Sequence, residues 1–183
     1  MAYPTIDAPY GLKPVNLIGG QGFSGSTRQL KIASNYGTAI FYGDVVKYAS
    51  DGTIQIDTGT TAATPIGVFL GVTYTDPSTS QVTFKQSYPA STVASDIMAY
   101  VLDDPDALFK VAAVSGTTTV AGYGRTIVNN NVSLVQNTGS SVTGDSKVAM
   151  LGASAATTNT LPLRVVDVVE DTKTADDTYV EFI

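Results

Sequence analysis

The sequence contains no histidine, no cysteine and no tryptophan. Without imidazole and thiolate there is no Ser-His-Asp or Cys-His nucleophile system, no zinc site built on those ligands and no disulfide bond. Carboxylates, lysine and tyrosine are the groups left for proton transfer near neutral pH. We therefore expect a protein that is not an enzyme, with no cofactor, no metal ion and no small-molecule substrate.

Charged residues are also scarce, at 14% of 183 residues against about 25% in an average globular chain. The net charge is −6, and the lysines and arginines do not cluster, which disfavours a nucleic-acid partner. Apolar stretches such as 66–72 are far shorter than the roughly 18 residues that span a membrane. The opening residues 1–7 lack the basic and apolar regions of a signal peptide, and the absence of cysteine favours an intracellular or virion setting.

What the sequence has in abundance is threonine and serine, with 25 and 15 residues, whereas glutamate occurs only as Glu170 and Glu181. β-Branched and hydroxyl side chains favour strands, and good helix formers are few. The composition predicts an all-β fold, a compact β-barrel or β-sandwich domain of short antiparallel strands. We expect this domain at 28–183, with a loop-rich portion at 115–160.

Residues 1–27 are predicted to form an extended N-terminal arm. Prolines at positions 4, 9 and 14 and glycines at 19, 20, 22 and 25 disfavour both a helix and a central strand. The arm is nevertheless rich in apolar side chains, so it either wraps its own domain or lies across a neighbouring subunit. The candidate interface residues of the arm are Tyr3, Pro4, Tyr10, Leu12, Lys13, Pro14 and Leu17.

Residues 44–57 are predicted to form a hairpin with a three-residue loop at 50–52. This loop pairs Val46 with Ile56 and leaves Lys47 beside Gln55 on the solvent face, whereas a two-residue turn would mix the faces. Gly52 would take the left-handed conformation.

Residues 65–74 have two apolar faces and predict a central strand, closely approached at Gly67 and Gly71. The alternation in 81–88 predicts Val82, Phe84 and Tyr88 inward. Strands are further expected at 96–102 and 107–114 around a hairpin turn, and at 161–170 and 178–183, where alternation places both glutamates in solvent.

Three motifs are weighed against simpler interpretations. Residues 20–25 match the dinucleotide fingerprint G-x-G-x-x-G, but alternating Leu30 and Ile32 predict a strand where a nucleotide site needs a helix. The carboxylates of Asp103, Asp104 and Asp106 could bind Ca²⁺, although such residues more often form a solvated turn. The two aspartates at 176–177 are likewise interpreted as solvated turn residues rather than as a metal site.

Several segments together resemble small structural proteins of tailed bacteriophages of marine and cyanobacterial hosts. They are residues 8–20 (APYGLKPVNLIGG), 24–28 (SGSTR), 42–46 (YGDVV), 65–72 (PIGVFLGV) and 103–105 (DDP). The Gly-Asp-Val-Val strand followed by Ile-Gly-Val is similar to β-rich capsid decoration, or cement, proteins.

The resemblance implies a protein of the outer capsid surface in the virion, made in the host cytoplasm. It would bind the major capsid protein, bridge neighbouring capsid subunits through its N-terminal arm and form a homo-oligomer, with a trimer favoured. The alternatives are a head fibre base, a tail or connector protein, or a host-glycan-binding β-sandwich. Because so few charges are present, we expect an attachment that salt barely weakens.

Overall fold

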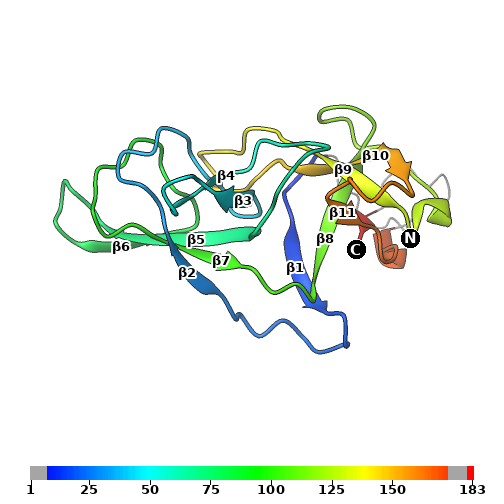
Figure 1. Ribbon diagram of the computed structural model, residues 1–183, viewed down its shortest axis with the longest axis horizontal. Helices are drawn as coiled ribbons and strands as arrows, with labels where there is room; N and C mark the ends of the chain where they lie inside the picture. Colours follow the sequence, from blue (N-terminus) through cyan, green and yellow to red (C-terminus); the bar gives the residue numbers. More distant parts are fainter. Residues whose placement is uncertain (1–7, 173–180) are drawn as a thin grey trace.

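The computed structural model describes residues 8–172 and 181–183 and is all-β. Two six-stranded sheets lie next to each other in an elongated molecule (Figure 1). No helix in these ranges is long and apolar enough to cross a membrane. The first sheet contains β2 (Arg28–Lys31), β3 (Val45–Tyr48), β4 (Ile54–Ile56), β5 (Gly67–Thr75), β6 (Val82–Lys85) and β7 (Met98–Leu102). The second contains β1 (Lys13–Leu17), β8 (Ala107–Val114), β9 (Asn131–Val135), β10 (Ala149–Ala156), β11 (Leu163–Arg164) and β12 (Glu181–Phe182). Two 3₁₀ turns, η1 (Arg125–Ile127) and η2 (Glu170–Thr172), complete the described elements.

The predicted hairpin is confirmed as the pair β3 and β4. Val46 faces Ile56 and Lys47 faces Gln55, and the Ala49 N–H donates to the Thr53 carbonyl at 2.8 Å to close a three-residue loop. Gly52 has φ +81°, the left-handed conformation that glycine adopts without strain. The side-chain pattern alone therefore selected the correct register.

Strand β5 is central, as predicted, because it pairs with β7 on one side and with β3 and β6 on the other. A Cβ on Gly67 would overlap the carbonyl oxygen of Leu102, and one on Gly71 would lie 3.0 Å from the Phe84 ring. Both predicted close approaches are thus present.

The register of β5 shifts at an irregularity between Phe69 and Gly71. This bulge changes which side chains share a face. Phe69 joins Val72 in one core cluster, whereas Leu70 packs against the other. The strict alternation expected for this strand is therefore wrong beyond Leu70.

Strand β6 corrects a prediction. Tyr88 is fully buried, but Val82 is 79% exposed and Phe84 is 66% exposed, so both point outward rather than inward. The reason is that β6 lies at the edge of the sheet, with β5 as its partner. Alternation identifies which residues share a face but not which face the core covers.

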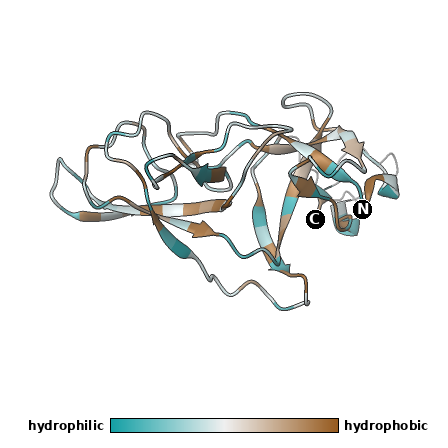
Figure 2. Cartoon of the chain, viewed as in Figure 1, coloured by the Kyte–Doolittle hydropathy of each residue, from teal (hydrophilic) through white to brown (hydrophobic). Residues whose placement is uncertain are grey.

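The turn at Asp103–Asp106 does not form a hairpin, which is a second correction. Strand β7 belongs to the first sheet and β8 to the second, so this turn carries the chain from one sheet to the other (Figure 1). Strand β8 then pairs with β1, β10 and β12. Figure 2 shows apolar stretches on β5, β7 and β8, whereas β2 and much of β1 are hydrophilic.

The described part of the N-terminal arm belongs to its own domain up to Leu17. Strand β1 pairs antiparallel with β8 and lies at the sheet edge, where Pro14 is tolerated. Leu12 is 2% exposed within the core of the second sheet. Of the two alternatives, residues 8–17 therefore follow the one in which the arm packs on its own domain.

Of the strand predicted at 161–170, β11 covers Leu163–Arg164, and the described end of the chain meets this segment as expected. The Ile183 N–H donates to the Asp167 carbonyl and the Val169 N–H donates to that of Glu181, both at 2.9 Å. Glu181, however, is 2% exposed, so its predicted exposure is wrong, whereas Glu170 is exposed.

Candidate functional site

An apolar groove of about 500 Å³ opens between the two sheets. Its floor consists of core residues of both halves, among them Val68, Val111 and Phe182, which are at most 5% exposed. The turn between β7 and β8 and the segment around β11 form its walls. A groove of this size and lining is suited to apolar side chains of a ligand or partner.

The rim of the groove combines apolar and charged side chains. Ile18 is 63% exposed and Val166 is 48% exposed, so both present apolar area to water. Asp104 and Arg164 add charges of opposite sign. The lining therefore offers apolar burial at its centre and polar contacts around it, as protein-binding surfaces do.

A buried polar cluster fixes the N-terminal segment against the C-terminal strand. The Tyr10 hydroxyl donates a hydrogen bond to a Glu181 carboxylate oxygen, and the Lys110 ammonium lies 3.3 Å from the same carboxylate. Burial and the adjacent carboxylate raise the pKa of Tyr10 far above its usual value. Tyr10 therefore stays protonated and continues to donate, which keeps residues of both chain ends beside β8.

Two lysines of like charge face each other across this cluster. Lys13 and Lys110 are direct partners in the β1–β8 ladder, a placement that repulsion would disfavour. The Tyr10 ring lies 4.8 Å from the Lys13 ammonium and 5.8 Å from that of Lys110. The ring and the Glu181 carboxylate together offset the repulsion.

Asp44 lies where the two sheets meet and is fully buried. Its neighbour Gly43 accepts a hydrogen bond from the Leu12 N–H at 3.0 Å and donates to the Phe69 carbonyl at 2.8 Å. Burial raises the pKa of Asp44 to about 6, while hydrogen bonds with the Ser146 side chain and, at 2.7 Å, from the Phe41 N–H oppose the shift. The junction therefore contains a carboxyl group that is neutral in mild acid and charged above it.

The structure describes five of the seven predicted interface residues. Tyr10 and Lys13 are brought together in the buried cluster, and Leu12 lines the floor of the groove. Pro14 and Leu17 are partly buried in β1. Tyr3 and Pro4 lie outside the described residues, as do Asp176 and Asp177.

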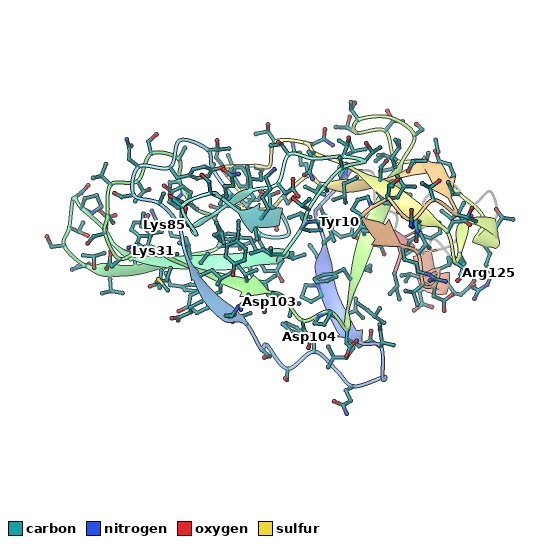
Figure 3. All side chains as sticks on the ribbon, viewed as in Figure 1. Tyr10, Lys31, Lys85, Asp103, Asp104 and Arg125 are labelled. Atoms are coloured by element: carbon teal, nitrogen blue, oxygen red, sulfur yellow. The ribbon has the colours of Figure 1, made fainter. Side chains whose placement is uncertain are left out.

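The carboxylates of the 103–106 turn have local partners. Asp103 forms an ion pair with Arg28, and the Asp104 carboxylate accepts the Asp106 N–H at 2.9 Å. In the part of the chain that the structure describes, no three acidic side chains gather as a metal site would require. Figure 3 places Asp103 and Asp104 on the connection between the sheets.

The glycine-rich stretch 20–25 leads into strand β2, as the alternation of Leu30 and Ile32 predicted. A nucleotide fingerprint needs a helix N-terminus at this point. The glycines therefore form part of an extended connection from β1 to β2.

Sequence reasoning missed Glu181, Lys110 and the groove. A glutamate at the end of an apolar strand is one signal for a buried ion pair, because such a residue enters a core only with partners. The groove has no local signal, since it is lined by residues far apart in the chain.

No protein-family model matches the chain, and neither a curated protein nor a solved structure is significantly similar to it.

Proposed function

We propose that this chain is a non-enzymatic structural protein of a phage virion, which decorates the capsid and bridges neighbouring capsid subunits. The observation that carries the proposal is the groove between the sheets, whose rim exposes Ile18 and Val166. Its occupant would be an apolar segment of the major capsid protein. The segments that resemble phage structural proteins support the same assignment.

The groove supports attachment by burial rather than by charge. Fully burying one large aliphatic side chain contributes about 1.5–3 kcal/mol. A segment that covers both Ile18 and Val166 would therefore gain a substantial part of its binding free energy from these two side chains. Apolar burial is also screened little by salt. Attachment should therefore change little between low salt and the ionic strength of seawater.

The test is binding to purified expanded shells. Replacing Ile18 and Val166 together by Gln should lower occupancy at a fixed protein concentration by more than about tenfold. The matched control is Val142→Gln, because Val142 is 94% exposed and does not line the groove. Full occupancy by the double variant, or release of the wild type by salt alone, would contradict the proposal.

Copy number distinguishes decoration from the other virion roles. A decoration protein should be present in hundreds of copies per particle, and as a trimer if it follows the family that it resembles. Tens of copies or fewer would instead favour a fibre base, a tail protein or a connector protein.

A further inference from the structure

The free edge of β6 is the feature that neither the groove nor the proposed attachment uses. Val82 and Phe84 are the two most exposed apolar side chains of the first sheet. Phe84 also contacts Tyr100, with ring centroids 5.5 Å apart, so the exposed surface continues onto β7. Edge strands are usually protected by charge, proline or a covering segment. On β6, however, the side chains of Val82 and Phe84 lie exposed to solvent.

The hydrogen-bond alternation of the ladder shows which backbone groups are free. The Asp76 N–H donates to the Gln81 carbonyl at 2.8 Å, so hydrogen-bonded pairs recur at Tyr74–Thr83 and Val72–Lys85. The N–H and C=O groups of Val82 and Phe84 therefore point away from β5. Within the described residues, neither makes a hydrogen bond to a group outside its sheet.

We propose that this edge pairs antiparallel with the β6 edge of a second copy, which joins two first sheets into one continuous sheet. One register pairs the free backbone groups of Val82 and Phe84 in one copy with those of Phe84 and Val82 in the other. It sets Val82 opposite Phe84 of the second copy, Phe84 opposite Val82, and Thr83 opposite its own equivalent at a twofold axis.

This register is self-complementary in its side chains. Val82 and Phe84 of both copies lie on one face and form two apolar cross-strand pairs. On the other face Lys85 lies opposite Gln81 rather than opposite another lysine. Asp76 pairs with Gln81 in the β5–β6 hairpin of its own copy. It therefore lies two strands away from Lys85 of the second copy, so the nearest charges across the twofold axis are opposite in sign.

The contact closes after two copies, because the same edge is used by both. Four residues of each strand bury too little area for a permanent dimer. Pairing should therefore be weak in solution and strengthened where copies are held close together. Such crowding is what the proposed place on a shell would supply, although the pairing itself needs no capsid.

Charge substitutions test the register by sedimentation analysis of the pure protein across a range of concentrations. Phe84→Lys alone and Val82→Glu alone should each weaken self-association by about tenfold, because each places a charge against an apolar side chain twice. The double variant should regain self-association. In it, the introduced carboxylate at position 82 of one copy faces the introduced ammonium at position 84 of the other, in both cross-strand pairs. Since 0.5 M salt screens that attraction, it should remove the recovery but barely change the wild type.

A cysteine at the axis provides a second test, which is clean because the chain has no other thiol. In the proposed register the two Thr83 Cα atoms form a non-hydrogen-bonded pair about 4.5 Å apart, within the range of a disulfide. Oxidised Thr83→Cys should accumulate as a covalent dimer, while Thr118→Cys in an exposed loop should not. Circular dichroism confirms that each variant is folded.

Three results would overturn the pairing: a wild type that stays monomeric at millimolar concentration, a double variant no better than the single ones, or equal crosslinking at positions 83 and 118. None of them bears on shell binding. Loss of shell binding by the groove variants with intact β6 pairing, or the reverse, separates the two proposals.

Discussion

Both sheets contain six strands, but they connect different parts of the chain. In the first, β3–β4 and β5–β6 pair with their immediate sequence neighbours. In the second, β8 binds β1 and β12, which come from opposite ends of the sequence. Turn chemistry therefore contributes to the first sheet beside its long-range pair β2–β7, and contacts between distant residues contribute to the second beside its neighbouring pair β9–β10.

The largest expected effect is the difference in stability loss between two phenylalanine-to-alanine variants. Phe182→Ala in β12 should lower the free energy of unfolding by about 3–5 kcal/mol, because this ring is fully buried in the core of the second sheet. Phe84→Ala in β6 should cost less than about 1 kcal/mol, since that ring is mostly exposed. Urea denaturation of both variants measures the difference. Equal losses would contradict the difference in burial between these two rings.

A smaller effect concerns the junction that both sheets share. The pKa of Asp44 in the folded protein is about 6, above its ordinary value of 3.8, so the folded state binds this proton more tightly than the unfolded state. The stability that this proton contributes is complete below pH 3.8 and is lost as the pH rises through about 6. The shift corresponds to about 3 kcal/mol between these limits.

Asp44→Asn removes this titration and retains a side-chain oxygen for the Phe41 N–H. The variant should therefore exceed the wild type in stability at pH 7 by up to about 3 kcal/mol and match it near pH 4. Asp51, Asp76 and Asp96 have lowered pKa values because their carboxylates accept local hydrogen bonds, so they lose their contributions to stability only at more acidic pH. A wild-type-minus-variant difference that is flat from pH 4 to 8 would show that Asp44 does not titrate in this range.

The smallest effect tests the local turn of the first sheet. Gly52→Ala should cost about 1 kcal/mol, because φ is +81° there and no neighbouring atom would contact the new methyl group. Gly37→Ala is the matched control, since that position is equally open and has no left-handed φ. Thermal unfolding of the pair isolates the backbone strain. An equal loss of stability at both glycines would contradict the explanation that the left-handed conformation at position 52 requires glycine.

Sequence reasoning succeeded where the deciding contacts are local. The β3–β4 register follows from a single loop and the pattern on either side of it, and the two close approaches at Gly67 and Gly71 follow from missing side chains in an apolar strand. It failed where the answer depends on a distant partner. Glu181 is buried because Tyr10 and Lys110 reach it, and alternation in β12 contains no information about either residue.

The arm and the groove show the same limit. Proline spacing correctly disfavoured a helix and a central strand, but whether β1 binds its own domain depends on the free edge of β8. The groove exists because the 103–106 turn redirects the chain between the sheets instead of closing a hairpin. The turn residues are the same whether the turn closes a hairpin or connects two sheets. The sequence therefore predicted the turn but not which sheet the next strand joins.

The position of strand β5 between the two cores has a consequence for how the molecule unfolds. Phe69 packs in the core of the first sheet, while its neighbours Val68 and Leu70 pack with the core of the second. A strand that contributes consecutive side chains to two cores cannot leave one of them and stay ordered in the other. The two halves should therefore melt in a single cooperative transition, with one set of calorimetric and spectroscopic midpoints for the whole chain.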